Sequence, residues 1–309
     1  MAGELIVTDD QVQYGSLLLG GGSPYVITAD GIEGWEDMPG LDSTDQARPS
    51  QDGLWPGARY LGARMVTIPV SIYPDWDAGR RTGLALLREL QRQIRPHADE
   101  QPLVIRIGGE SLMCWARINT RVTERLSTTW MAAGELDLTL QWVATDPLRY
   151  SIVESVASTP LPQRSQGLLW TAVSGTDRLD WVTAGSVSVL DWGTEGTPGG
   201  LVVVNDGTED TRPRFTITGP VTTPAVIRTD TGDRLEYDIA LAAGDTLTID
   251  TRCGSVLLNG TASRDHLATG RSVLLEEFVC PPGSTALAFG ALDGASPATM
   301  TAVWRSAYL

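Results

Sequence analysis

The stretch RMVTIPVSIY at residues 64–73 decides the fold of the first half of this 309-residue chain. Its apolar side chains stand at every second position, with Thr, Pro, Ser and Tyr between them. A period of two is typical of a strand with one face in a core and the other in solvent. Residues 136–142, LDLTLQW, repeat the pattern. The sequence therefore predicts half-buried antiparallel strands.

One segment beside these strands has a helical period instead. After Pro74, Asp75 can cap a helix that Pro96 stops. Apolar residues recur in it at intervals of three and four, at Leu84, Leu87, Leu90 and Ile94. We predict one amphipathic helix of about five turns.

Two further strands are predicted at residues 103–107 and 112–122. They are joined through Gly108-Gly109-Glu110, which is typical of a hairpin turn. The first half is thus expected to be a mainly β sandwich or barrel with one helix laid across it.

The second half contains only short strand patterns. Asp146-Pro147 ends the last strand of the first half, and we place a domain boundary near residue 150, giving domains 1–150 and 151–309. Turns rich in Gly, Pro or Asn-Gly separate the predicted strands at residues 201–204, 214–218, 225–229, 234–239, 246–250, 255–258, 286–289 and 300–304. This spacing favours an antiparallel β-sandwich of the jelly-roll kind.

Composition excludes several classes of function. All 23 basic residues are Arg, so Schiff-base chemistry and the phosphate loop that needs a lysine are absent. Only His97 and His266 offer imidazoles, which nearly excludes histidine-rich metal sites. The net charge of −15 argues against nucleic-acid binding. No apolar run approaches the roughly 18 residues of a membrane helix, so we expect no membrane insertion.

No group of residues forms a recognisable catalytic site. Ser263, Asp265 and His266 are neighbours in sequence, which is not the geometry of a triad. The pair Glu276-Glu277 would point to opposite faces of a strand, unlike the carboxylates of a glycosidase. We therefore predict no enzyme, no cofactor and no metal.

Three cysteines, Cys114, Cys253 and Cys280, carry no metal-binding spacing. Buried free thiols are the expectation, with a bridge between Cys253 and Cys280 left open.

Tryptophans recur every 11 residues at Trp170, Trp181 and Trp192, each two positions after a leucine. If these three tryptophans and Trp304 were exposed on the sandwich, they could hold sugar rings. Residues two positions apart lie on the same face of a strand, so each leucine and its tryptophan are favoured as core residues instead. Sugar binding stays an alternative.

The region from 29 to 62 has no periodicity but much Gly, Pro and Asp, interrupted by Trp35, Leu41 and Trp55. Solvated tails gain nothing from tryptophan, so contact with another molecule is favoured over disorder. Its acids match no calcium loop, and a solvated acidic face is the preferred interpretation.

Ordered motifs along nearly the whole chain resemble the distal tail proteins of phages with long non-contractile tails. In the first half they are Gly40-Leu41-Asp42, Gln51-Asp52-Gly53, Trp55-Pro56-Gly57, Arg64 at the head of its strand, the Leu-rich helix and Asp146-Pro147 with Tyr150. In the second half they are Asn205-Asp206-Gly207-Thr208, Pro213, Phe215, Ile217, Gly219, Thr231-Gly232, Gly244-Asp245, Ile249-Asp250-Thr251, Asn259-Gly260, Pro282-Gly283 and Val303-Trp304-Arg305.

The resemblance implies a tail-tube-like N-terminal domain, six copies of which form a ring, and a galectin-like C-terminal sandwich. Such a structural hub joins the tail-tube protein above to tail-tip or baseplate proteins below, in a virion assembled in the host cytoplasm. Genome DNA would pass through its lumen without specific binding. Our candidates for the contact between subunits are Trp35, Leu41, Arg48, Asp52, Trp55 and Arg64.

Alternative functions remain open. The chain could be a tail-tube subunit with an appended sandwich, or a carbohydrate-binding protein. A glycoside hydrolase ranks last, because no carboxylate pair is identifiable.

Overall fold

The computed structural model describes residues 2–74, 79–123, 130, 134–162, 199–294 and 297–309. The chain divides into two compact units. The first unit takes Met1–Val153, Gly207–Glu209 and Arg305–Leu309, and the second takes Glu154–Asp206 and Asp210–Trp304. The domain division at residue 150 stays a prediction, and two short later segments belong with the first unit as well.

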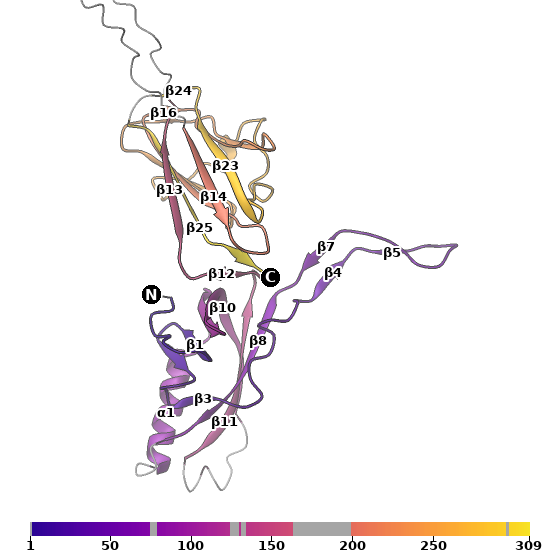
Figure 1. Cartoon of the computed structure of the whole chain (residues 1–309), viewed down its shortest axis with the longest axis vertical. Helices are drawn as coiled ribbons and strands as arrows, with labels where there is room; N and C mark the ends of the chain where they lie inside the picture. The colour runs from indigo at the N-terminus through magenta and orange to yellow at the C-terminus, as the bar shows by residue number, and fades with distance from the viewer. Residues whose placement is uncertain (1, 75–78, 124–129, 131–133, 163–198, 295–296) are drawn as a thin grey trace, which may run out of the picture. The chain divides into compact units, whose positions relative to one another are not determined.

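The first unit is built on a nine-stranded antiparallel sheet (Figure 1). Its order is β2-β1-β9-β10-β11-β8-β3, and β12 pairs with both β10 and β26. The strands are β1 (Gln11–Tyr14), β2 (Leu17–Leu19), β3 (Tyr25–Ile27), β8 (Arg64–Ile72), β9 (Gln101–Ile107), β10 (Glu110–Thr123), β11 (Leu136–Ala144), β12 (Arg149–Ser151) and β26 (Ala307–Tyr308). The Gly20 amide at one end of the sheet donates to the Tyr25 carbonyl at the other, over 2.8 Å, so the sheet curls into a nearly closed barrel.

The two alternating stretches form neighbouring strands, as predicted. β8 and β11 pair without interruption from Ile72↔Leu136 to Arg64↔Ala144. The alternate side chains are fully buried at Val66, Ile68, Val70, Ile72, Leu140 and Trp142. The hairpin between β9 and β10 is also confirmed, and Gly108 and Gly109 have φ values of 60° and 84°, which favour glycine.

The predicted helix is α1 (Gly79–Gln93), whose expected cap, Asp75, lies outside the described residues. Leu87 and Leu90 join the barrel core, while Leu84 stays 38% exposed. The Tyr25 hydroxyl donates to the Leu86 carbonyl over 3.0 Å and ties the helix to β3. Among the residues described, the expected mainly β fold with one α-helix is confirmed for the first unit.

The second unit is a β-sandwich, as predicted. One sheet has the order β13-β25-β15-β20-β21-β22, the other β14-β23-β17-β18, and a third, small sheet the order β19-β16-β24. The strands are β13 (Ser155–Pro160), β14 (Gly200–Asn205), β15 (Arg214–Thr218), β16 (Val221–Thr222), β17 (Ala225–Arg228), β18 (Arg234–Glu236), β19 (Ala240–Leu241), β20 (Thr246–Asp250), β21 (Ser255–Leu258), β22 (Ala262–Ser263), β23 (Gly283–Gly290), β24 (Asp293–Gly294) and β25 (Thr299–Trp304). All eight strands predicted from the second half are present.

Alternate residues of these strands build the second core. Phe215 on β15 meets Phe278 edge to face, with ring centroids 5.8 Å apart. Trp304 is 7% exposed, and its indole Nε1 donates to the Val204 carbonyl over 2.7 Å. Trp304 is therefore a core residue and offers no platform for a sugar. The repeat of Trp170, Trp181 and Trp192 lies outside the described residues.

The aperiodic region holds a long two-stranded hairpin, which the sequence did not predict. β4 (Leu41–Ser43) pairs with β7 (Arg59–Leu61), and β5 (Gln46–Ala47) pairs with β6 (Leu54–Trp55). Figure 1 shows this hairpin extending away from the barrel strands. We call residues 38–62 the arm.

The three cysteines are free thiols, so the bridge left open between Cys253 and Cys280 is not formed. Cys114 and Cys280 are buried as expected, whereas Cys253 is exposed. Burial raises the pKa of both buried thiols to about 12.

We expect a thiol reagent such as DTNB to modify one cysteine per chain rapidly at pH 8. The two buried thiols should react only on unfolding, because they are inaccessible and their pKa lies far above the assay pH. Mass spectrometry of the labelled peptides checks this, with Cys253→Ser as the control that loses the fast phase. Rapid labelling of Cys114 in the folded chain would contradict the burial described here.

Candidate functional site: the arm and its root

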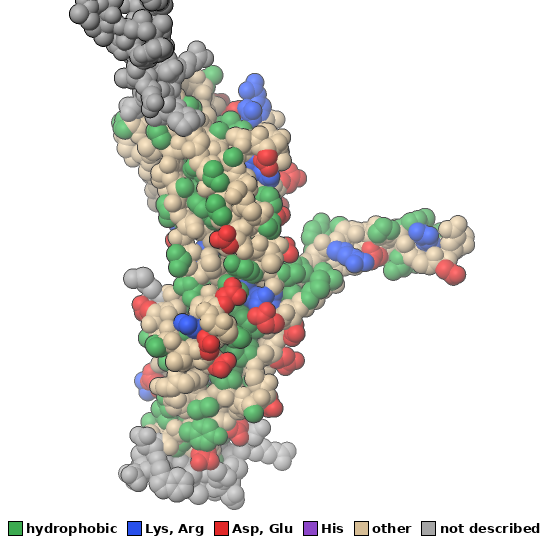
Figure 2. Space-filling view, in the orientation of Figure 1, with side chains coloured by type: hydrophobic (Ala, Val, Ile, Leu, Met, Phe, Trp, Pro, Cys, Tyr) green, Lys and Arg blue, Asp and Glu red, His purple; other side chains and the backbone are tan. Residues whose placement is uncertain are grey.

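The arm exposes an unusual amount of apolar surface for so small an element, and Figure 2 shows hydrophobic side chains along it. The exposed fractions are 61% for Met38, 44% for Leu41, 54% for Leu54, 53% for Trp55 and 67% for Tyr60. An isolated two-stranded hairpin is at best marginally stable in water. Exposed aromatic groups of this kind mark surfaces that contact another molecule.

Backbone and carboxylate contacts keep the arm extended. Thr44 N donates to the Ala58 carbonyl over 3.1 Å, between the two pairs of strands. Asp45 accepts a hydrogen bond from Gly57 N over 2.6 Å and lies 3.5 Å from the Arg59 guanidinium. The Gly57 hydrogen bond is the largest of the contacts that lower the pKa of Asp45.

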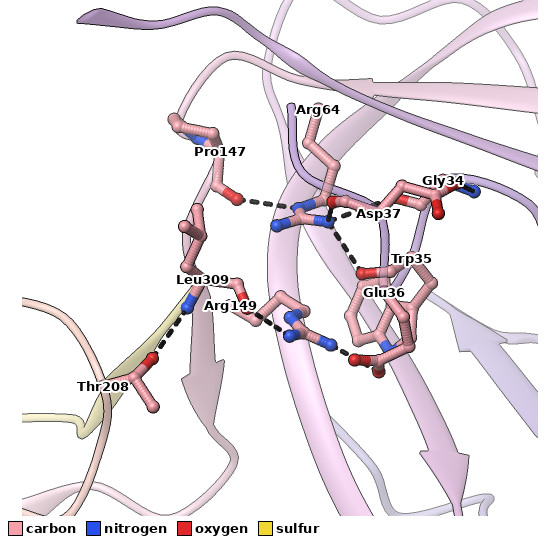
Figure 3. A network of polar contacts seen from close by, with 9 residues as sticks. All are labelled: Gly34, Trp35, Glu36, Asp37, Arg64, Pro147, Arg149, Thr208 and Leu309. Atoms are coloured by element: carbon pink, nitrogen blue, oxygen red, sulfur yellow. Dashed lines mark hydrogen bonds and ion pairs between the residues drawn. The ribbon is translucent and has the colours of Figure 1, made fainter. Parts of the chain in front are cut away.

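Arg64 fastens the arm where it joins the barrel. It is the first residue of β8, and it is 1% exposed. One of its terminal nitrogens, Nη1, donates to three carbonyls of the segment that leads into the arm: Gly34 at 3.0 Å, Trp35 at 2.7 Å and Asp37 at 2.9 Å (Figure 3). Its Nε donates to the Pro147 carbonyl over 2.7 Å. A single guanidinium thus joins the outgoing and the returning legs of the arm, and we call residues 34–37 with Arg64 the arm root.

Burial lowers the pKa of Arg64, and the nearby charge of Arg149 lowers it further. The guanidinium stays protonated nonetheless, because its usual pKa is far above neutral. The four carbonyl dipoles around Nε and Nη1 compensate for part of the buried charge, while Nη2 is buried without a hydrogen-bond partner.

Gly34 allows the close approach that this geometry requires. Its φ is +82°, and a Cβ there would lie 1.9 Å from the Met65 carbonyl oxygen. Any other residue would push the root away from β8.

Arg149 forms a second layer of contacts beneath the root (Figure 3). Its guanidinium donates to the Glu36 carboxylate and to the Leu309 carbonyl. Its Cζ lies 5.5 Å from the centroid of the Trp35 ring, within cation–π range. Trp35 itself is 2% exposed and belongs to the barrel core.

The interface candidates separate into two groups. Leu41, Arg48, Asp52 and Trp55 lie on the arm, where all but the half-buried Arg48 are exposed. Trp35 and Arg64 are buried within their own unit, where they take part in the arm root. The assignment of all six residues to a subunit contact stays a prediction.

Sequence reasoning missed Arg149, Glu36 and Leu309. Arg149 lies 113 positions from Glu36 and 160 positions from Leu309 along the chain, so no local pattern connects them. An arginine between the apolar Leu148 and the aromatic Tyr150 was the one hint in the sequence that Arg149 is buried.

The polar cluster around His266 is a turn. Ser263 Oγ donates to Asp265 over 2.6 Å, and the other carboxylate oxygen of Asp265 accepts from Val256 N over 2.7 Å. His266 is exposed in a short 3-10 helix. Asp265 thus holds the Val256 amide, and the Ser263 hydroxyl is bonded to Asp265, so the cluster shapes the turn.

Within the described part of the chain, no cluster of three or more His, Cys, Asp or Glu side chains is arranged to bind a metal ion. Among those same residues, no helix has the length and apolarity needed to span a membrane.

Known proteins resemble this chain in sequence over part of its length and in structure over nearly all of it. Residues 206–308 match the family described as siphovirus-type tail component, C-terminal domain. The whole chain is similar in structure to SPP1 Dit (gp 19.1), described as a paradigm of the hub adsorption apparatus in phages that infect Gram-positive bacteria. The TM-score is 0.64 at 12% sequence identity, over 97% of this chain and 99% of that one.

Two structures of the phage P2 baseplate in its activated conformation also match. The one with Ca has a TM-score of 0.48 at 11% identity, over 92% of this chain and 91% of that one. The one with Sr has a TM-score of 0.49 at 10% identity, over 96% and 97%. A search of curated protein sequences found no match. The resemblance to distal tail proteins that the ordered motifs indicated is confirmed.

Proposed function

We propose that this chain, a Dit-like structural component of a siphovirus-type tail and not an enzyme, forms the distal hub of that tail. Six copies would close into a ring that joins the tail-tube protein to the tail-tip or baseplate proteins. The virion's DNA would leave through the lumen of this ring. The site of action is then the tail tip of the virion.

The observation that carries this proposal is the arm. Both units resemble SPP1 Dit, but a fold does not by itself specify a contact. Covering the exposed Leu54, Trp55 and Tyr60 with another surface would lower the free energy, because it removes apolar area from water. Other copies of the same chain are made in the same cell, and head-to-tail contacts between copies that close by rotation give a ring. We expect an obligate interface of over roughly 2,000 Å².

Charge favours the arm as the point of contact. The chain carries −15, so six copies carry −90 in total and repel each other. The arm holds three acids, Asp42, Asp45 and Asp52, against Arg48 and Arg59, which leaves a net charge of −1 over 25 residues. A nearly neutral, apolar element is the part of such a chain that approaches a copy at the lowest electrostatic cost. The remaining acidity would repel DNA phosphates in the lumen and let the duplex slide.

The alternative of a tail-tube subunit with an appended sandwich differs in copy number. A hub needs about one ring per particle, whereas a tube subunit stacks in many rings. Quantitative gel densitometry of purified virions against a tail protein of known copy number separates the two.

Native mass spectrometry of the purified full-length chain tests the proposal. We expect a closed oligomer of a single size, six copies being the predicted number, and labelled antibodies should locate the chain at the tail tip. A monomer at high protein concentration, together with the absence of the chain from virions, would refute the hub function.

A further inference from the structure

Residues Arg305–Leu309 return to the first unit after the chain has completed the second. β26 pairs there with β12, through Tyr308↔Arg149 and Ala307↔Tyr150. Leu309 N donates to the Thr208 hydroxyl over 3.2 Å. These late residues are therefore an integral strand of the unit that carries the arm.

The backbone at Gly207 packs directly against the backbone of the docked segment. A Cβ at Gly207 would lie 1.8 Å from the Ala307 carbonyl oxygen and 2.5 Å from its carbon. Both are backbone atoms, which cannot turn aside as a flexible side chain would. The segment docks only because residue 207 is glycine.

Arg149 connects this docked segment to the arm root (Figure 3). One end of its guanidinium donates to the Leu309 carbonyl and the other to the Glu36 carboxylate, while its face covers Trp35. The Arg149 side chain is only 7% exposed, and a charge this deeply buried requires acceptors for its donors. When Leu309 is not docked, one donor of the buried Arg149 guanidinium loses its acceptor. Burying Arg149 beneath the arm root then costs more free energy, so the root is held less firmly.

We propose that docking of Arg305–Leu309, acting through Arg149, fixes the arm root in the position that a neighbouring copy can engage. The proposal rests on the function proposed above, in which the arm contacts other copies. Under this proposal the arm is held in its binding position only after β26, the last strand of the first unit in sequence order, has been made and has docked. A chain whose second unit is still incomplete lacks that strand and does not recruit neighbours.

Hydrogen exchange of the dissociated full-length protein tests the link directly. Gly207→Ala blocks docking of the segment, and Arg149→Met cuts the connection while keeping the apolar stem. Glu36→Gln weakens the contact between Glu36 and Arg149, and this variant should fold normally because the Glu36 side chain is 67% exposed. The protected amides of this segment are those of Glu33, which donates to the Thr67 carbonyl, and Gly34, which donates to the Asp37 carboxylate. Hydrogen bonds to a charged group are strong enough that we expect these two amides to exchange about 10- to 100-fold faster in Gly207→Ala and Arg149→Met. Amides of β11, which pairs with β8 and β10 and not with the root, should not change.

Two matched controls accompany these variants. Gly270→Ala adds a methyl group at a glycine with no neighbouring atom within 4 Å. Arg106→Met removes an arginine paired with Asp9 at 3.0 Å, elsewhere in the same unit. Both should exchange at residues 33–37 as the wild type does.

The outcomes separate this proposal from the hub function. Unchanged exchange at the root in both main variants overturns the link, and faster exchange in Arg149→Met alone overturns the role of the segment. Rings that form in both variants at the wild-type concentration overturn the condition on assembly, since we expect at least a tenfold higher concentration to be needed. If the wild type forms no rings, the hub function fails, while the exchange data still decide whether the segment fixes the root.

Discussion

Replacing Trp55 and Tyr60 together by serine is expected to abolish ring formation while leaving the subunit folded. Both side chains are more than half exposed, so their loss should change the free energy of unfolding by no more than about 0.5 kcal/mol each. Buried Trp and Tyr anchors at interfaces typically contribute about 2 kcal/mol or more each. The contact between copies should therefore weaken by roughly a thousandfold.

Mass photometry over a concentration series measures the loss, and circular dichroism reports the fold. The matched control is the double variant Leu274→Ser with Leu292→Ser, two side chains of the second unit that are 65% and 80% exposed. It removes comparable apolar surface away from the arm and should assemble normally. Assembly of the arm variant at wild-type concentrations would show that the arm is not the contact.

Replacing Arg64 by alanine is expected to destabilise the first unit by about 3–5 kcal/mol. The substitution leaves the carbonyls of Gly34, Trp35, Asp37 and Pro147 without their shared donor and opens a cavity beside β8. At the size of this unit, the unfolding temperature should fall by roughly 6–20 °C.

Differential scanning calorimetry checks this expectation, because two units can unfold in separate transitions. Only the transition of the first unit should move. Arg64→Lys should recover part of the loss, since an ammonium keeps the charge but not the planar fork that reaches four carbonyls. Arg92→Ala is the control: Arg92 is 63% exposed and pairs with Glu89 on the helix surface, so its removal should cost under about 1 kcal/mol. A loss as small for Arg64→Ala would contradict its role at the root.

Sequence reasoning succeeded wherever one core imposes a period. β8 and β11 alternate because every second side chain lies in the barrel, and the strands of the sandwich alternate for the same reason. The arm escaped prediction because both its faces are exposed, so no side of the hairpin has to be apolar and no period results.

Polar residues can be buried where backbone groups satisfy them, and the sequence carries no sign of it. Gln11 and Gln13 of β1 are 4% and 2% exposed. The Gln11 carboxamide oxygen accepts from the amides of Val7 and Thr8, so a side chain replaces a strand partner. Arg64 is comparable: its acceptors are carbonyls, which every residue carries and which leave no trace in the sequence. For that reason Arg64 was named from the sequence only as a candidate for the subunit contact, and Arg149 was not named at all.

The first unit is a mosaic of three separate stretches of chain. Recombination at a single crossover therefore cannot transplant it intact: a graft cut after Val153 would leave behind the glycine turn at residue 207 and the β26 strand. Exchange between related chains would preserve such a unit only when the sandwich travels with it, because replacing residues 154–304 also replaces Gly207–Glu209 of the first unit. The layout favours inheritance of the chain as one piece.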